Sequence, residues 1–359
     1  MEAHLPGDLV QLQSLPLEAK IMLTKRRIEV WYESWARFEI YNQKTKKTRF
    51  VTWDIRDPSS EPPLRNNEII QAIFPGSVYV SFSGGKDSTV LKHIVDSMYD
   101  DVPSVFVDTG LEYPEVRMFA RERADVVLRP EMRFDEVIKT YGYPVPSKEV
   151  AQIVREAKIG LARGDGSYSF RIAKLKGELK DKDGKLSKFN QKKWGFLLDA
   201  PFDVSEQCCN VMKKNPTKKY EKETGRRAII GAMATESRLR TQRWYRYGCN
   251  AFGDRRRPTS NPLSFWTEQD ILEYLRRYNL PYASVYGEIV ETETGLKTTG
   301  CERTGCMFCM FGCHLDKIPN RFQTMRETHP RQWEYCMKPV EEKGLGLREV
   351  LGYIGVPYE

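Results

Sequence analysis

A polar loop between an apolar strand and a helix is the feature that most constrains the fold of this chain. The apolar run VYVSF at 78–82 indicates a buried strand, and a helical pattern with its apolar residues on one face begins near residue 86. Between the two lie polar residues and glycines, in the order Ser83, Gly84, Gly85, Lys86, Asp87 and Ser88. Since a further apolar strand follows the helix, the order predicts a strand–loop–helix–strand unit within a parallel sheet.

The residue types of this loop predict that it binds phosphate groups. Gly84 and Gly85 allow backbone angles that are closed to other residues, so a phosphate can approach the chain. Backbone N–H groups at the start of the helix then face the anion. Lys86 adds a positive charge, and Ser83 and Ser88 add hydroxyl donors. The loop is therefore predicted to hold the phosphates of a nucleotide.

Asp87 distinguishes this loop from a Walker A loop. That pattern needs Gly at position 80 and Ser or Thr at position 87, whereas the chain has Val80 and Asp87. A carboxylate at this place can cap the helix or approach a Mg²⁺ ion bound to the phosphates.

Further strands predict an α/β fold with a doubly wound, mostly parallel sheet. The run VPSVFVDTG at 102–110 follows the first helix, and DVVLRP at 125–130 and RAIIGAM at 227–233 supply two more strands. We expect three regions: an N-terminal helical extension and connector over 1–75, a nucleotide-binding domain over 76–260, and a C-terminal helical module with clustered cysteines over 261–359.

Three segments outside the sheet have recognisable patterns. Residues 17–38 show apolar residues at roughly helical spacing and predict one amphipathic helix. Residues 155–200 are rich in Gly, Lys and Asp and are interpreted as a basic insertion or a mobile flap. Thr267 precedes the apolar face of the next helical pattern and is its expected N-cap.

Positive charge is concentrated in residues 151–257, which carry 26 Lys and Arg against 12 Asp and Glu. Within this range, 238–258 interleaves arginines with Trp244, Tyr245 and Tyr247. Such a segment suits a nucleic acid or a multiply phosphorylated small molecule as partner. The alternative is that the arginines hold only the nucleotide and the remaining charges form a solvated surface.

Composition also limits the location of the chain. No stretch approaches 18 consecutive apolar residues, so no membrane span is expected, and the N-terminal residues do not resemble a secretory signal. We therefore expect a cytoplasmic protein whose eight cysteines are reduced, which favours metal binding or catalysis over disulfides.

The cysteines form an adjacent pair and a later cluster. Cys208 and Cys209 are neighbours, and Cys306 and Cys309 have the CxxC spacing of metal ligands. A second CxxC, as in a zinc ribbon, is missing. Near the cluster lie Cys301, Cys313 and His314, while Cys249 and Cys336 stand alone and are expected to be buried apolar residues.

Four segments together resemble the phosphoadenosine phosphosulfate (PAPS) reductase family, within the ATP pyrophosphatases of the adenine nucleotide alpha-hydrolase superfamily. The loop SGGKDS resembles the superfamily's pyrophosphate loop, and FVDTGLEYPE at 106–115 resembles its strand-two nucleotide motif. GAMATESRLRTQR at 231–243 and NPLSFWTEQDILEYL at 261–275 resemble the family's later elements. The resemblance implies nucleotide contacts from the loop and from Asp108, Thr109, Gly110, Glu236, Ser237 and Arg240.

The resemblance also implies cofactors. ATP, or PAPS or adenylyl sulfate, would bind with Mg²⁺, and Lys86, Asp87 and Arg240 would act in catalysis. A CC pair with a distant CxxC is similar to the cluster-binding pattern of assimilatory sulfate-reductase relatives. It implies a [4Fe-4S] cluster, with zinc as the alternative, on Cys208, Cys209, Cys306 and Cys309. Cys301 or Cys313 can replace one of the pair, and His314 is a weaker candidate.

The expected function is an ATP pyrophosphatase that adenylates its substrate in sulfur transfer, with a sulfur-donor protein as a further partner. This is the chemistry of the DNA-phosphorothioation protein DndC, which the chain resembles. Reductases of the family use a nucleophilic cysteine in an ECGLH-type tail, whereas no cysteine follows Cys336 here. The alternatives are a PAPS or adenylyl-sulfate reductase that uses a partner thiol, and a non-catalytic module that senses nucleotides or binds nucleic acid.

Overall fold

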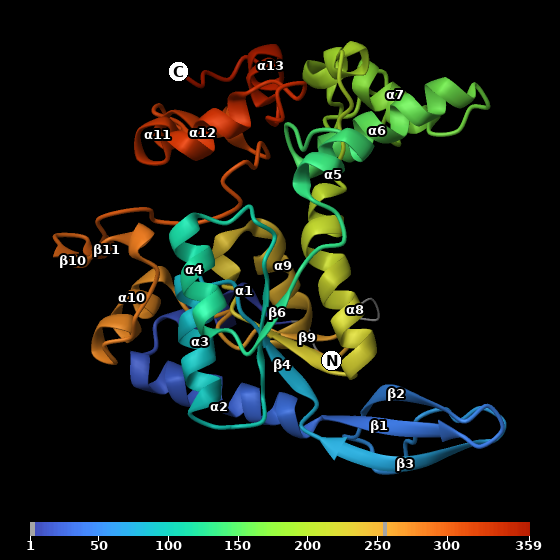
Figure 1. The fold of residues 1–359 in the computed structure, drawn as a ribbon, viewed down its shortest axis with the longest axis vertical. Helices are drawn as coiled ribbons and strands as arrows, with labels where there is room; N and C mark the ends of the chain where they lie inside the picture. Colours follow the sequence, from blue (N-terminus) through green and yellow to red (C-terminus); the bar gives the residue numbers. More distant parts are fainter. Residues whose placement is uncertain (1–3, 254–256) are drawn as a thin grey trace. The chain divides into compact units, whose positions relative to one another are not determined.

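The computed structural model describes residues 4–253 and 257–359 (Figure 1). The chain divides into two compact units, each built from two separate stretches. Unit 1 contains Met1–Arg129 and Pro216–Thr304, and unit 2 contains Pro130–Asn215 and Gly305–Glu359. No helix in these described ranges combines the length and the apolar character needed to cross a membrane.

Unit 1 holds every strand that belongs to a sheet in the described ranges. Its elements before the break are α1 (Pro6–Gln13), α2 (Leu17–Glu33), β1 (Trp35–Asn42), β2 (Lys47–Asp54), β3 (Glu68–Pro75), β4 (Val78–Ser81), α3 (Lys86–Asp96), β5 (Ser104–Val107), α4 (Pro114–Arg123) and β6 (Val126–Leu128). After the break come α8 (Asn215–Thr224), β7 (Arg227–Ile230), η3 (Ala234–Glu236), α9 (Arg238–Tyr247), β8 (Asn250–Ala251), β9 (Thr259–Ser260), α10 (Glu268–Arg277), η4 (Ser284–Tyr286), β10 (Ile289–Thr292) and β11 (Gly295–Thr298).

The central sheet of unit 1 has six strands in the order β6-β5-β4-β7-β9-β8. All neighbouring pairs are parallel except β8 and β9. Successive side chains of a strand point to opposite faces, so Val78 and Val80 pack with α2, α3 and α10, while Tyr79 packs against Tyr220 of α8. Helices therefore cover both faces, which confirms the predicted α/β class with a mostly parallel sheet.

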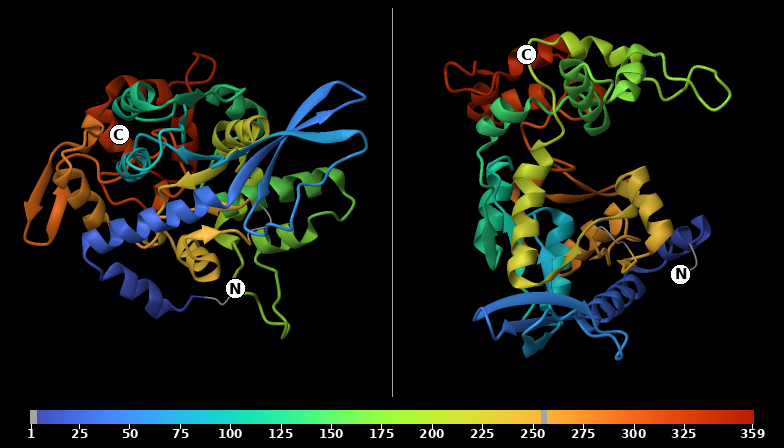
Figure 2. Two further views of the ribbon diagram at one scale, coloured as in Figure 1. Left: turned by 90° about the horizontal axis from the view of Figure 1, so that it is seen from below. Right: turned by 90° about the vertical axis from the view of Figure 1, so that its right-hand side faces the viewer.

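A second sheet precedes the first parallel strand. The strands β2-β1-β3 pair antiparallel and appear in blue in both views of Figure 2. The predicted helix over 17–38 is wrong at its end, because α2 stops at Glu33 and Trp35 begins β1. Beyond that point the buried residues alternate as Ala36, Phe38 and Ile40, a period of two that fits a strand and not a helix.

Unit 2 is largely helical. Its elements are α5 (Phe134–Tyr141), α6 (Lys148–Arg163), α7 (Ser169–Lys176), η1 (Lys192–Asp199), η2 (Asn210–Lys214), η5 (Cys313–Leu315), α11 (Arg321–Thr328), α12 (Pro330–Met337) and α13 (Leu347–Tyr353). The segment 155–200, interpreted as an insertion or a flap, continues α6 and contains α7 and η1. Ala157, Leu175, Trp194 and Leu197 are buried there, so apolar residues scattered among the lysines give this basic segment a packed core.

Candidate functional site

The phosphate loop of unit 1 lies where the order of the parallel strands reverses. From β4 the sheet extends through β5 and β6 on one side and through β7 on the other. Ligands of open α/β sheets bind beyond the carboxyl ends of the strands at such a switch point. The loop after β4 and the segment after β7 therefore meet at the expected binding position (Figure 1).

The loop has the backbone that its sequence predicts. Gly84 has φ +73°, and a side-chain carbon there would lie 2.8 Å from the carbonyl oxygen of Val116 and from the β-carbon of Ala120. Only glycine fits this place, because the left-handed angle and the nearby α4 both exclude a larger residue. Ser83 and Ser88 close the loop, since the Ser83 N–H donates to Ser88 Oγ over 3.1 Å.

Lys86 is buried at the start of α3, with 4% of its surface exposed. Its ammonium group forms an ion pair with Glu268 and donates to the carbonyl oxygen of Glu302 over 3.0 Å. The same nitrogen lies 5.0 Å from the centre of the Tyr286 ring. The loop lysine is thus held by residues about two hundred positions away, all within unit 1.

Asp87 faces two further carboxylates. Burial raises the pKa of Asp87 to about 7, with the negative charges of Glu268 and Glu236 as further causes, while Lys86 and Arg303 oppose the shift. Its Oδ1 atom is buried and has no hydrogen-bond partner. A carboxylate oxygen of this kind can accept a hydrogen bond from a ligand or coordinate a cation that approaches the loop.

The segment after β7 brings the predicted Glu236, Ser237 and Arg240 to the same edge. Glu236 accepts a 2.8 Å bond from the N–H of Met233 and pairs with Arg240 and, over 2.7 Å, with Arg303. Ser237 is the N-cap of α9 and its Oγ accepts from the N–H of Arg240. The ion pairs hold two arginines close to the loop.

The strand-two motif lies after β5, next to the helix that packs against the loop. Asp108 is buried and receives two bonds from Arg117, of 2.5 and 3.1 Å, which fasten α4 to the end of the strand. The Thr109 hydroxyl donates to Glu112 over 2.7 Å, and Gly110 has φ +72°. In this structure the Asp108 carboxylate therefore anchors α4.

Sequence reasoning missed Glu268, Tyr286 and Arg303. The predicted N-cap Thr267 is confirmed and places Glu268 in the first turn of α10. Glu268 also lies in the segment 261–275 that resembles a family element, but neither signal marked it as a site residue. Tyr286 lies in a segment with no recognised motif, and Arg303 lies between Cys301 and Cys306, where only the cysteines were considered. A cavity of about 290 Å³ opens beside Glu268 and Arg303. Its lining includes the apolar side chains of Met233, Leu272 and Leu296 and the charged side chain of Glu236.

The candidate metal ligands gather in unit 2. Burial raises the pKa of Cys208 far above its usual range, and the neighbouring thiols of Cys209, Cys306 and Cys309 raise it further. The pair Cys208–Cys209 and the CxxC at Cys306 and Cys309 thus lie near enough to interact electrostatically, although nearly a hundred positions separate them in sequence. Within residues 4–253 and 257–359, however, no three His, Cys, Asp or Glu side chains lie close enough to hold one metal ion.

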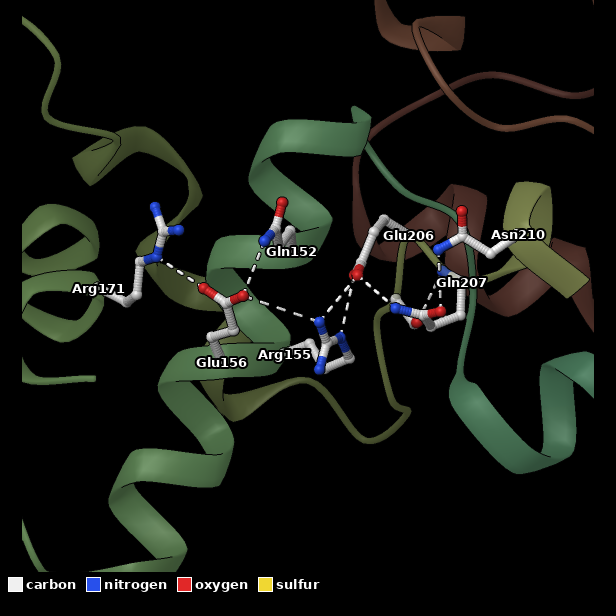
Figure 3. A network of polar contacts seen from close by, with 8 residues as sticks. Gln152, Arg155, Glu156, Arg171, Glu206, Gln207 and Asn210 are labelled. Atoms are coloured by element: carbon white, nitrogen blue, oxygen red, sulfur yellow. Dashed lines mark hydrogen bonds and ion pairs between the residues drawn. The ribbon is translucent and has the colours of Figure 1, made fainter. Parts of the chain in front are cut away.

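A network of charged and amide groups fixes the segment before the cysteine pair (Figure 3). Arg155 of α6 donates to both carboxylate oxygens of Glu206, over 3.0 and 2.8 Å. Gln207 donates to Glu206 over 2.6 Å and accepts from Asn210 over 3.0 Å. Bidentate ion pairs of this type restrict geometry, so the backbone on both sides of the cysteine pair is tied to α6.

Cations surround the thiols. The positive charges of Arg321 and Lys148 lower the pKa of Cys309, although burial, the larger effect, leaves it raised. Arg321 also donates to the carbonyl oxygen of Cys309 over 3.1 Å. Buried and half-buried thiols beside basic groups suit an anionic metal–thiolate centre, since the cations offset its negative charge.

The remaining cysteines divide between the units. Cys301 belongs to unit 1, where burial raises its pKa and Tyr113 of the strand-two motif opposes that shift, whereas Cys313 is buried in unit 2. Cys249 and Cys336 are buried, as expected. His314 packs edge-on against Trp194, with ring centres 4.9 Å apart. Of the two alternative ligands, Cys313 is therefore the one in the same unit as the four thiols.

Comparison with known proteins gives a match to the family described as the phosphoadenosine phosphosulfate reductase domain, over residues 77–151 and 168–311. These ranges cover more than half of the chain and include the loop and the four thiols. An uncharacterized protein of Methanocaldococcus jannaschii is 33% identical over 73 residues, 19% of this chain. The chain spans 18% of the length of that curated relative.

Proposed function

This chain belongs to the phosphoadenosine phosphosulfate reductase domain family, and from that premise we propose that it is an ATP pyrophosphatase that activates an acceptor for sulfur transfer. The observation that supports this most is the unpartnered buried oxygen of Asp87, beside Lys86 and close to the carboxylates of Glu236 and Glu268. These carboxylates repel the phosphates of a nucleotide, so a cation bound with the nucleotide would favour its approach. Mg²⁺ is bound by one or two carboxylates together with substrate phosphates, and Asp87 would be such a carboxylate.

In the proposed reaction an acceptor oxygen attacks the α-phosphate of ATP. The bond between the α-phosphorus and the bridging oxygen breaks, and pyrophosphate leaves in the loop. Lys86 and Arg240 stabilise the negative charge that develops on the leaving group. Mg²⁺ held by Asp87 and the phosphates would supply further charge neutralisation.

The test of this reaction uses the anaerobically purified full chain with ATP, Mg²⁺ and candidate nucleic acids, scored for pyrophosphate. Lys86→Ala should lose ATP affinity and turnover, because the leaving pyrophosphate loses its buried cation. Lys92→Ala is the matched control, since Lys92 lies on the same helix and pairs with Asp96 and Asp125 away from the loop. Equal activity of the two variants would contradict the proposal.

The same assay separates the alternatives. Sulfite release from PAPS or adenylyl sulfate with thioredoxin, without pyrophosphate from ATP, would support the reductase. Nucleotide binding without either product would support a non-catalytic sensing or nucleic-acid-binding module. Basic residues of 151–257 are proposed as the contact with a nucleic acid, although Arg255 and Arg256 of that segment lie outside the described residues.

We further propose that Cys208, Cys209, Cys306 and Cys309 hold a [4Fe-4S] cluster in unit 2. The thiolates of such a cluster bind different iron ions and therefore lie farther apart than the ligands of a single zinc ion. The effect of the Cys209, Cys306 and Cys309 thiols on Cys208 supports a ligand set drawn from both parts of the sequence. When bound, the cluster would supply redox-active iron and labile sulfide next to basic side chains.

Metal analysis tests the cluster. Anaerobically purified protein should contain about four iron and four sulfide ions per chain and absorb near ~400 nm. Cys306→Ser should abolish both, whereas Cys336→Ser, a buried cysteine outside the proposed ligand set, should change neither. Stoichiometric zinc without sulfide would overturn the cluster in favour of the alternative.

A further inference from the structure

The antiparallel sheet β2-β1-β3 has two edges of different character. It lies before residue 77, where the family match begins, and the proposed reaction makes no use of it. The edge strand β2 carries Lys47, Arg49 and Asp54. The other edge strand, β3, has no charged residue from Ile69 to Pro75. Charged residues on an edge prevent pairing with other strands, so only β2 is protected in this way.

The side chains of β3 are exposed as well as apolar. Ile69, Ile73 and Phe74 keep 44%, 55% and 39% of their surface exposed. Figure 1 shows β3 as the outer strand of its sheet, and its only strand neighbour in the described chain is β1. One row of backbone N–H and C=O groups therefore faces outward between large apolar side chains, which is the arrangement that accepts a further strand.

We propose that β3 pairs antiparallel with β3 of a second copy of this chain, so that two three-stranded sheets join into one. The twofold axis would pass between Gln71 and Ala72. Ile69 then lies opposite Phe74, and Ile70 lies opposite Ile73.

The faces of the sheet agree with this register. Ile69 pairs with Tyr41 of β1, and Phe74 pairs with Arg37. Both pairs lie on one face of the sheet, and the other face carries the buried residues of β1, Ala36, Phe38 and Ile40. The register shift of β3 against β1 falls between these residues, and it lets the two halves of β3 present matching faces to each other. Each exposed apolar side chain then meets another, as cross-strand stabilisation requires.

A second copy fits this edge because the strand is complementary to itself. No charge between Ile69 and Pro75 repels its own copy, and the nearest carboxylate, Glu68, is already paired with Arg49 over 2.6 Å. An isologous interface uses one patch on both partners. The seven uncharged residues meet that condition in a single strand.

The test is the oligomeric state of the full chain, measured by sedimentation and light scattering over a range of concentrations. Wild type should dimerise. Ile73→Lys should raise the dimer dissociation constant at least ~100-fold, because the twofold axis removes two apolar contacts and introduces two charges. Since Ile73 is more than half exposed, the variant should stay folded, which circular dichroism would verify.

Thr48→Lys is the matched control, as it adds the same charge to an exposed position of the β2 edge. It should leave the dimer intact. A second measurement follows the backbone: amide exchange of residues 69–74 should slow as wild-type concentration rises, and should not in Ile73→Lys. A monomeric wild type, a dimer that survives Ile73→Lys, or a dimer disrupted by Thr48→Lys would each overturn the proposal.

Discussion

Replacing Gly84 by alanine tests whether the phosphate loop depends on its backbone. The new side-chain carbon would meet the carbonyl oxygen of Val116 and the β-carbon of Ala120 at 2.8 Å, closer than such atoms normally approach. A left-handed backbone angle costs a non-glycine residue about 1–2 kcal/mol, and forced overpacking adds about 1–3 kcal/mol. Gly84→Ala should therefore lower the free energy of unfolding of unit 1 by about 2–5 kcal/mol.

Gly110→Ala separates the cost of the backbone angle from the cost of the contact between residue 84 and α4. Gly110 has nearly the same φ, +72° against +73°, and belongs to the same unit, but nothing lies within 4 Å of an added carbon. It should cost only the angle term of about 1–2 kcal/mol. The difference between the two variants measures how tightly α4 packs against the loop.

The assay is urea denaturation read by amide exchange of peptides from β4 and α3, which reports unit 1 separately. ATP affinity is measured in parallel by calorimetry and should fall in Gly84→Ala, because Val116 and Ala120 push the loop away from its phosphate-binding shape. If Gly84→Ala cost no more than Gly110→Ala, the close packing of loop and α4 would be refuted. Unchanged ATP affinity in a destabilised Gly84→Ala would refute the link between loop shape and binding.

Three further predictions follow from charged groups. Lys20→Met should destabilise unit 1 by about 3–5 kcal/mol in denaturant titrations, because it leaves the buried carboxylate of Asp270 without the ammonium group that binds it over 2.7 and 2.8 Å. The double variant Lys20→Met with Asp270→Asn should recover most of the lost stability. The raised pKa of Asp87 means that the folded state binds more protons than the unfolded state between about pH 4 and 7. The contribution of protonated Asp87 to the free energy of unfolding is therefore lost as the pH rises through that window. Asp87→Asn should flatten the dependence of this free energy on pH there. Lys192→Ala with Lys193→Ala should reduce the salt dependence of binding to single-stranded or duplex nucleic acid, and a slope equal to that of wild type would count against this basic segment as the contact.

The backbone of the loop at 83–88 could be predicted because its determinants are local. The strand, the two glycines and the helix start lie within a dozen residues, and backbone geometry follows from them. The partner of Lys86 could not be predicted in this way, since Glu268 lies 182 positions away. The six-residue pattern fixes where the lysine begins its helix, whereas the ion pair depends on how α10 packs against α3.

The end of α2 shows a second limit. Trp31, Trp35 and Phe38 are spaced by four and three residues, which suits a helix face, and all three are buried. Phe38 also belongs to the alternating series of β1. Apolar spacing alone cannot separate these possibilities over so few residues, and the pairing of β1 with β2 and β3 decides in favour of the strand. The same holds for residues 155–200, where four buried apolar side chains outweigh a composition typical of loops.

The burial of Lys86 constrains how the proposed nucleotide would enter the site. A buried cation without a partner is strongly unfavourable, so the lysine must keep an anion at every stage. Its side chain is 5% exposed, whereas that of Glu268 is 42% exposed. Glu268 can therefore turn into water when a phosphate arrives, and Lys86 can exchange one anion for another with little movement of its own. Because the carbonyl oxygen of Glu302 also accepts from Lys86, the ammonium group stays oriented during the exchange. If the loop binds phosphates as proposed, the ion pair with Glu268 would hold the lysine in place until the phosphates replace that carboxylate.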